Sequence, residues 1–416
     1  MSGRAKVRVR VGGAAFAALG ALAGSLAGAS AAGADDGGGL PYTQVEQVAK
    51  GVTYGQFTVD GAKGPVTGYM LTADLSDPRV RVNLLTPGAV AARAPVSQLA
   101  DAAQAVGAVN GDFFNISEEH AGVTPTGSSD GPEISSGRAL KAAVPNSQRF
   151  GPAMPPGETT QDVLGVGVDR RARLDRLALV GSVRTRQGSY PLGGFNQYAL
   201  PEGGIGAYTS GWGTISRERA VCGSDTARGA ACSTDTYEVT VRGGRVTAVA
   251  DTPGEGAIEP GSTVLVGRDA GADTLRTLKV GDRADVGERL APSGSHVPYT
   301  FAVGGFPVLR DGAALAGLDA KTAAVRTAAG FGDHGRTLYL LALDGTAAAD
   351  PGLTVAEVAD VMRRAGADDA VNLDGGGSTT MVTRTPDAPA ATVRNNPSGV
   401  AERPVANAVG VFSTGR

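Results

Sequence analysis

Two short segments, far apart in the chain, each place a carboxylate directly after an apolar strand. The more informative one reads Val-Asn-Leu-Asp-Gly-Gly-Gly-Ser over residues 371–378. Consecutive glycines leave backbone N–H groups uncovered, so an oxyanion can approach them closely. An aspartate beside such a loop combines an acid, base or metal ligand with an anion cradle. A lone glycine triplet is more often only a tight turn, so the interpretation depends on the second segment.

That second segment reads Asn-Gly-Asp-Phe-Phe over residues 110–114. Asn-Gly favours a left-handed or primed turn. We expect Asp112 to project from this turn while the two phenylalanines anchor it in the core. An ordinary turn with a solvated aspartate is the alternative. Taken with the glycine triplet, the segment predicts one pocket in which Asp112 and Asp374 form a pair of carboxylates.

Two arginines stand near polar clusters at expected strand edges. Arg326 lies in an expected strand over 323–330, and Arg403 precedes an expected last strand over 405–412. A guanidinium is planar and permanently charged, which suits bidentate binding of phosphate or carboxylate. A surface ion pair, for instance between Glu402 and Arg403, is the commoner role of an arginine.

Other catalytic signatures are weak or absent from the sequence. Of the three histidines, His120 is close enough to Asp112 in sequence to reach the same site. Residues 127–131 match G-x-S-x-G, but no apolar strand precedes them, so a Ser-His-Asp hydrolase has little support. No G-x-x-x-x-G-K-[ST], H-E-x-x-H or paired Cys-x-x-Cys occurs, which argues against nucleotide triphosphate chemistry and zinc. A divalent cation, Ca²⁺ or Mg²⁺, held by aspartates and carbonyls stays open.

The N-terminus has the layout of a secretory signal peptide. Four basic residues within the first ten precede an uncharged, Ala/Gly/Leu-rich stretch over 11–28, and small residues at 29–31 offer a cleavage site. An uncleaved membrane anchor is the alternative, but the apolar stretch is short and weakly hydrophobic. We predict a signal peptide over 1–31, a flexible lead-in over 32–48 and a single catalytic domain over 49–416. The mature protein would be secreted, without a stable membrane span, and the cell wall is one expected location.

The charge of the chain argues against nucleic acid as a partner. The formal net charge is −3, and loss of the four basic residues in the predicted leader gives −3 − 4 = −7. Nucleic-acid affinity comes mainly from phosphate neutralisation by Lys and Arg. The sequence says nothing about the oligomeric state.

The two cysteines, Cys222 and Cys232, are separated by a loop-like stretch of small and polar residues. An even pair in an exported chain predicts one disulfide that closes a surface loop. Two buried free thiols are the alternative.

Alternating apolar and polar residues predict strands through much of the chain, with few helices. Thr354 and Glu357 form a predicted capping box for a helix over 355–365, and another helix is expected over 98–106. Residues 120–160 are rich in Gly, Pro and Ser and are expected to form a long ordered loop without regular structure. The order of elements favours a mixed α/β (α+β) fold, with strand-rich mixed sheets and a few packed helices.

Taken together, these segments resemble the phosphodiester glycosidase family, of the N-acetylglucosamine-1-phosphodiester α-N-acetylglucosaminidase type. The matching segments occur in the family's order. They are residues 109–114, 122–127, 134–137, 194–196, 208–210, 326–330, 343–345, 372–378, 396–398 and 402–403. The stretches 138–160 and 222–236 are individual to this chain, and the flanking domains of the vertebrate member are missing.

The resemblance implies hydrolysis of a sugar-1-phosphodiester, of the GlcNAc-1-phosphodiester type, at the C1–O bond. The products would be a free sugar and a phosphomonoester. Phosphate is already a good leaving group, so protonating it matters less than in ordinary glycosidases. The site then needs a cradle for the developing negative charge and a carboxylate that stabilises an oxocarbenium-like centre or activates water.

On this basis we expect Asp112 and Asp374 to act as the carboxylate pair, with Asp344 and Glu402 as second choices. The asparagines are expected to orient sugar hydroxyls, and the other substrate-binding groups to hold the phosphate. The expected substrate-binding residues are Asn110, Asn372, Gly375, Gly376, Gly377, Ser378, Arg326 and Arg403. Two other functions remain open: a non-catalytic binder of cell-envelope phosphosugar polymers, and a metal-dependent phosphodiesterase that cuts the P–O bond.

Overall fold

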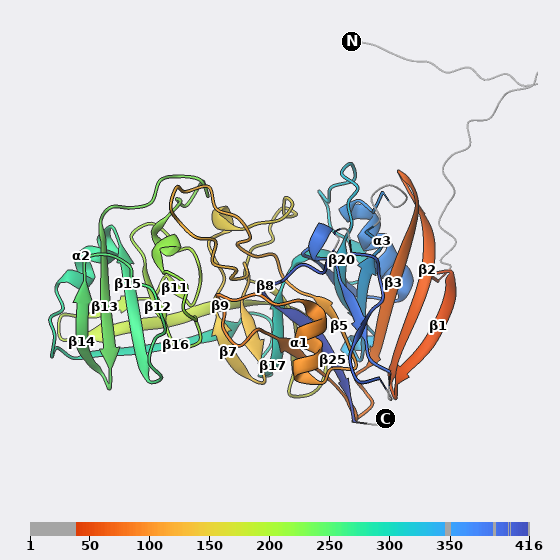
Figure 1. The fold of residues 1–416 in the computed structure, drawn as a ribbon, viewed down its shortest axis with the longest axis horizontal. Coiled ribbons are helices and arrows are strands. Elements are labelled where there is room, and N and C mark those ends of the chain that lie inside the picture. Colours follow the sequence, from red (N-terminus) through yellow and green to blue (C-terminus); the bar gives the residue numbers. More distant parts are fainter. Residues whose placement is uncertain (1–38, 346–350, 386–387, 398, 400, 415–416) are drawn as a thin grey trace, which may run out of the picture. The chain divides into compact units, whose positions relative to one another are not determined.

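Two β-sheets that pack face to face carry the candidate site. The computed structural model describes residues 39–345, 351–385, 388–397, 399 and 401–414, so the predicted signal peptide lies outside the described residues. The larger sheet pairs strands from the start of the described chain with strands from its last third (Figure 1). In spatial order these are β1 (Tyr42–Ala49), β2 (Val52–Gly61), β3 (Gly64–Asp74), β21 (Thr337–Leu343), β20 (Thr327–Gly332), β22 (Asp369–Leu373), β18 (Phe306–Arg310) and β19 (Ala313–Ala314).

The second sheet packs on one face of the first through a continuous apolar core, in which Leu71 and Val371 meet Val109 and Val409. Helix α3 (Val355–Ala365) covers the other face of the eight-stranded sheet, and α1 (Val96–Ala103) covers the outer face of the second sheet. The layers therefore run helix, sheet, sheet, helix. The second sheet consists of β24 (Thr392–Val393), β23 (Met381–Thr383), β5 (Gly107–Asn110), β25 (Ala408–Ser413) and β4 (Val80–Leu85).

Two further sheets are formed by the middle of the chain. One consists of β10 (Ser189–Pro191), β9 (Ala172–Thr185), β8 (Asp162–Gly167), β17 (Tyr299–Gly304), β6 (Glu133–Ser135) and β7 (Arg138–Lys141), with β16 (Ala284–Pro292) beside β9. The other consists of β11 (Gly194–Phe195), β12 (Ile205–Tyr208), β15 (Ser262–Arg268), β13 (Thr236–Arg242) and β14 (Arg245–Ala250), and α2 (Ala270–Arg276) packs on it. Short 3₁₀ turns are η1 (Asn146–Gln148), η2 (Glu218–Val221), η3 (Asp333–Gly335) and η4 (Gly376–Ser378).

The strand-rich α+β prediction is confirmed, although the sheets are less mixed than expected. Among the strand pairs of the described residues, β11 with β12 is the parallel one, and the others are antiparallel. Helix α3 has the predicted bounds, and Thr354 and Glu357 form the predicted capping box. Helix α1 begins and ends earlier than expected, because Gln104 adopts a left-handed conformation (φ 59°) that ends it.

Some predictions of local structure are wrong. The stretch predicted as a flexible lead-in over 32–48 overlaps β1, which begins at Tyr42. Residues 120–160 contain β6, β7 and η1 rather than only loop. β6 pairs with β7 next to it and with β17, which lies far along the chain and which a local pattern does not reveal. Arg326 lies just before β20 rather than within a strand, since the β20 ladder begins at Thr327 opposite Leu373.

By their mutual contacts, residues 39–416 group into one compact unit. No helix in the described part of the chain is long and apolar enough to cross a membrane.

Candidate active site

The carboxamide of Asn110 joins the two aspartate turns. Asn110 is the last residue of β5, and its side chain is fully buried. Its Nδ2 donates to the Asp374 carbonyl at 2.6 Å, while its Oδ1 accepts from the Thr327 hydroxyl at 2.8 Å and the Thr380 N–H at 3.1 Å. The Asp374 N–H donates to the Gly111 carbonyl at 3.0 Å. These bonds occupy the carboxamide of Asn110, which was expected to orient sugar hydroxyls. Asn110 therefore links the two turns to each other.

Gly111 is needed for space rather than for a left-handed turn. Its φ is not positive, so the expectation of a left-handed or primed turn is wrong. An ideal Cβ at Gly111 would lie only 2.0 Å from Oδ1 of Asn407, and that oxygen accepts the N–H of Asp112 at 3.0 Å. Any side chain at this position would displace the carboxamide that fixes Asp112.

Asp374 is the aspartate of the pair that is partly exposed. It follows β22 and lies beside Ser378, whose hydroxyl hydrogen-bonds its carboxylate. Burial raises the pKa of Asp374 to about 6, and the charge of Asp130 adds to this, while Ser378 and the Arg403 guanidinium oppose it. A carboxyl group with such a pKa changes protonation close to neutral pH, as an acid or base in catalysis must.

The glycine triplet is held by close contacts on two sides. A Cβ at Gly375 would lie 2.5 Å from the Val325 carbonyl oxygen, and a Cβ at Gly377 would lie 2.3 Å from Nη2 of Arg403. Gly376 has a φ of +58° and donates its N–H to the same Val325 carbonyl at 2.8 Å. The Gly375 N–H faces the carboxylate of the preceding aspartate. The predicted cradle is therefore smaller than expected, and the Gly377 amide is the member of the triplet best placed for an outside anion.

Asp112 lies in a buried group of charged residues rather than at the opening. Asp112, Asp130, Glu133 and Lys141 are each at most 2% exposed. The carboxylate of Asp112 accepts the Gly131 N–H at 2.6 Å. Burial, followed by the Asp130 charge, raises the pKa of Asp112 well above its usual value. A carboxyl group enclosed in this way supports the turn, and the geometry does not place it against a substrate.

Lys141 offsets the negative charge of these carboxylates. It contacts the carbonyl of Gly131, whose N–H bonds to Asp112. Its Nζ donates to the carbonyls of Gly131 at 2.5 Å and Ala142 at 2.7 Å. Burial lowers the pKa of Lys141, and the surrounding carboxylates, Glu133 first, oppose this. Glu133 accepts from Nδ2 of Asn407 at 2.8 Å, and Asn407 in turn fixes Asp112. The four charged side chains and Asn407 therefore form one connected support beneath the aspartate turns.

Two other predicted site residues, Arg326 and Asp344, form their hydrogen bonds with groups of the chain itself. The Arg326 guanidinium donates to the carbonyls of Leu353 at 3.2 Å and Thr322 at 2.9 Å, so it holds a loop. Both carboxylate oxygens of Asp344 accept from Asn396, at 2.6 and 2.9 Å.

Glu402 caps helix α1 from the far end of the chain. Its carboxylate accepts the Ser97 N–H at 2.8 Å and the Ser97 hydroxyl at 2.6 Å. The helix begins after Pro95 without a side-chain cap of its own, and a carboxylate at a helix N-terminus is stabilising. Glu402 therefore does not pair with Arg403, which is left to face the glycine loop.

The side chain of Asn372 is buried and has no hydrogen bond to any described residue. It is 1% exposed, and neither Nδ2 nor Oδ1 has a partner in the described protein. Such groups are rare in native structures and often mark a functional position or a bound water. Asn372 lies on β22, two residues before Asp374, which follows the end of the strand.

A pocket of about 480 Å³ adjoins the glycine loop. Arg403 lines it and donates through Nη1 to Ser378 Oγ at 3.3 Å. Arg93 lines the same pocket, with its stem against Gly127 and its guanidinium 5.9 Å from the ring centre of Phe114. Two cationic groups therefore border a space that Arg403 connects to the glycine loop.

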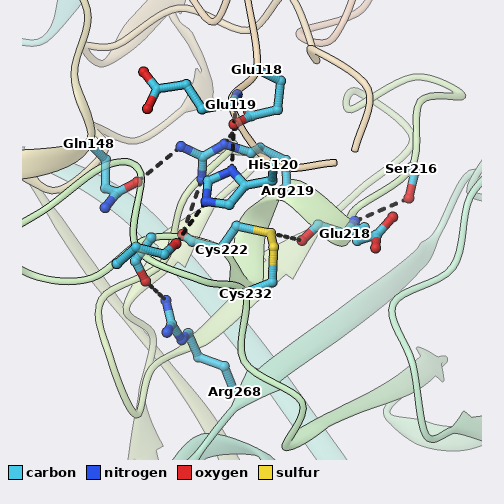
Figure 2. Close-up of a disulfide and its surroundings, with 12 residues drawn as sticks. Glu118, Glu119, His120, Gln148, Ser216, Glu218, Arg219, Cys222, Cys232 and Arg268 are labelled. Carbon is cyan, nitrogen blue, oxygen red and sulfur yellow. Dashed lines mark hydrogen bonds and ion pairs between the residues drawn. A yellow bond between two sulfur atoms is a disulfide. The ribbon is translucent and has the colours of Figure 1, made fainter. Parts of the chain in front are cut away.

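The predicted disulfide between Cys222 and Cys232 is confirmed (Figure 2). Beside it, His120 places Nδ1 2.5 Å from Glu118 Oε1 and Nε2 2.7 Å from the Ala230 carbonyl oxygen. The ring is therefore held from both of its nitrogens. His120 is thus held by the disulfide loop and does not reach Asp112.

One group of potential metal ligands is found in the described part of the chain, and it consists of His120 with the two cysteines. Because both sulfur atoms are in the disulfide, this group offers no thiolate to a metal.

Sequence reasoning missed five residues that build the site. They are Arg93, Asp130, Glu133, Lys141 and Asn407. Glu133 and Lys141 face each other between the neighbouring strands β6 and β7, in a stretch that was predicted to be loop, and Asp130 lies just before them. Arg93 and Asn407 come from distant parts of the chain, and no spacing pattern in the sequence could identify them.

Comparisons with known proteins agree with the resemblance. Residues 235–412 match the phosphodiester glycosidase family, the same family that the motifs resemble. No curated protein matches the chain.

Two of the solved structures that match the chain share its fold, with TM-scores of 0.67 and 0.64. A hypothetical protein from Synechocystis has 21% identity and a TM-score of 0.67, over 88% of this chain and 62% of that one. The chain thus spans less than two thirds of that protein. A candidate exported protein from Burkholderia pseudomallei K96243 has 24% identity and a TM-score of 0.64, over 85% of this chain and 75% of that one. The pro-peptide-inhibited catalytic domain of zebrafish N-acetylglucosamine-1-phosphodiester α-N-acetylglucosaminidase has 16% identity and a TM-score of 0.42, over 89% and 83%.

The side-chain amide of Asn372 has no hydrogen-bond partner among the described residues, and this leads to a prediction about the stability of the protein. Asn372→Leu replaces the amide with an apolar group of similar size, so we expect the free energy of unfolding to stay equal or to rise by about 1 kcal/mol. Urea unfolding of the purified protein measures this. Asn407→Leu is the matched control, because it breaks the bonds to Asp112 and Glu133 and should destabilise the protein by about 1–3 kcal/mol. A comparable loss in Asn372→Leu would mean that its amide is satisfied within the folded protein.

Proposed function

We propose that the protein hydrolyses sugar-1-phosphodiesters at the C1–O bond, as its match to the phosphodiester glycosidase family over residues 235–412 suggests. The observation that carries the proposal is the position of Asp374. Asp374 is partly exposed, and its carboxyl group, with a pKa of about 6, lies next to the glycine loop and the Ser378–Arg403 pair. A reacting carboxylate and an anion-binding group therefore occur side by side.

A site with one accessible carboxylate fits this substrate better than an ordinary glycoside. Most glycosidases need a second carboxyl group to protonate the departing oxygen. Here Asp112 is enclosed, and Asp344 and Glu402 are bonded to Asn396 and Ser97. A phosphate leaves as a stabilised anion, so the second acid is dispensable.

In the proposed complex, Arg403, the Ser378 hydroxyl and the Gly377 N–H hold the phosphate. Charge-assisted hydrogen bonds to these donors strengthen as the phosphate gains negative charge. Asn372, with its unpartnered amide, is assigned to the sugar. Arg326 keeps the loop at Leu353 in place and acts on the substrate only through that loop.

The proposed reaction breaks the C1–O bond, and its electron pair goes to the phosphate oxygen. Ionised Asp374 stabilises the positive charge that develops at C1 and takes a proton from the attacking water, whose oxygen bonds to C1. The products are the free sugar and a phosphomonoester. We assign GlcNAc-1-phosphodiesters as the first substrates to test.

We also propose that the protein is secreted. The disulfide and the absence of a membrane-crossing helix among the described residues are compatible with this. Cell-envelope phosphosugars would then be the accessible substrates.

Hydrolysis in oxygen-18 water tests the proposal against its two alternatives. We expect the label in the sugar, because water attacks C1. Label in the phosphomonoester would instead identify a phosphodiesterase that cuts P–O, and binding without products would identify a binder. The assay uses GlcNAc-1-phosphodiesters with mass spectrometry of both products. A parallel set with chelator shows whether Ca²⁺ or Mg²⁺ is required.

The pKa of Asp374 predicts how kcat/KM depends on pH. Because the ionised form is the active one, kcat/KM should rise with pH through a midpoint near 6. Asp374→Asn should remove this limb and lower kcat by on the order of a hundredfold or more. It should not unfold the protein, because a raised pKa means that ionisation of Asp374 disfavours the fold above about pH 6.

Asp112→Asn is the matched control for the pH profile. Its carboxyl group is buried and its pKa is raised well above the usual value, so the limb near pH 6 should persist in this variant even if the rate falls. A limb that disappears in Asp112→Asn and persists in Asp374→Asn would reverse the two assignments.

A further inference from the structure

The pocket next to Ser378 is larger than a single phosphate needs. It has a volume of about 480 Å³, and Arg403 forms its border with the glycine loop. Its other walls come from the segments at Pro125, Ile215 and Arg93. A phosphate held by Arg403 and Ser378 would therefore lie at one side and leave room for what is attached to it.

The two arginines of this pocket are held by different segments. Arg403 packs against Gly377 and bonds to Ser378, so it moves with the glycine loop. The stem of Arg93 packs on Gly127, and its guanidinium lies toward the ring of Phe114. Arg93 is exposed. The two cations are therefore held by different segments that meet at one pocket.

Among the described residues, neither guanidinium forms an ion pair with a carboxylate within 4 Å, whereas Arg217 contacts Glu238 at 2.9 Å. Arg403 is near enough to Asp374 to lower the pKa of that carboxyl group, but Arg93 has no such neighbour in the described part of the chain. Glu402, the nearest acidic residue in sequence, points to Ser97 instead. In a protein with a net charge of −3, two cations that lack a close ion pair and border one pocket create a local field that attracts anions.

We propose that Arg93 binds a second phosphate, located on the aglycone beyond the scissile phosphodiester. The preferred substrates would be sugar-1-phosphodiesters whose leaving group carries a further phosphate, as in a chain of phosphate-linked units. This inference rests on the proposed function, because it assigns the scissile phosphate to Arg403 and Ser378. Pro125 and Ile215 would contact the linking carbon atoms.

Binding of product-like phosphomonoesters tests the inference without requiring turnover. Calorimetry compares glycerol 3-phosphate with glycerol 1,3-bisphosphate. We expect the wild-type protein to bind the bisphosphate about tenfold more tightly, and this preference should weaken as salt is added. The preference should be lost in Arg93→Gln and partly retained in Arg93→Lys.

Arg186→Gln is the matched control, since it removes an equally exposed charge in the turn between β9 and β10. Its preference should equal that of the wild type. Equal binding of the two ligands by the wild type, or a preference that survives in Arg93→Gln, would overturn the inference. So would an equal loss of glycerol 3-phosphate binding in Arg93→Gln, because both arginines would then serve one phosphate.

Hydrolysis assays separate this inference from the proposed function. If the binding preference behaves as expected but no sugar-1-phosphodiester is cleaved, the second phosphate site stands and the hydrolase assignment falls. If simple diesters are cleaved and Arg93→Gln shows the same binding ratio as the wild type, the hydrolase assignment stands and the second site falls.

Discussion

The hydrogen bonds of Asn110 are the constraint on which the site depends. Asn110 ends a strand of one central sheet, and its carboxamide reaches the backbone at Asp374 and the hydroxyl of Thr327 in the other sheet. Two turns that are separated by more than half of the chain are therefore fixed within hydrogen-bond distance. Because the carboxamide is fully buried, loss of any one bond would leave an unpaired polar group in the core. The position of the reacting carboxylate is thus set by packing of the two sheets.

The buried charged group of Asp112, Asp130, Glu133 and Lys141 supports the site of Asp374 and does not itself react. Lys141 lies behind the peptide that bonds to Asp112, and Asn407 links Asp112 to Glu133. Removing one partner from such a group leaves an uncompensated charge, which is strongly destabilising. The same low-polarity surroundings, with Asp130 nearby, raise the pKa of Asp374. One buried group therefore stabilises the turn and tunes the carboxylate that remains accessible.

Local patterns in the sequence predicted the features that depend on neighbouring residues. The capping box at Thr354 and Glu357 and the disulfide each need only a short spacing, and both were confirmed. The two aspartate turns were recognised because glycine and asparagine have restricted uses. Glu402 was misleading because its partner, Ser97, is 305 positions away. The support beneath Asp112 was missed for the same reason, since its members meet only after distant strands have paired.

The position of the substrate relative to Asp374 is the central claim, and a crystal structure of Asp374→Asn with an uncleaved GlcNAc-1-phosphodiester tests it most directly. The account predicts that the phosphate lies against Ser378 and Arg403, with the anomeric carbon facing the side chain at position 374. A substrate found elsewhere, for instance in the groove between Val82 and Val166, would contradict it, and so would a sugar turned away from position 374.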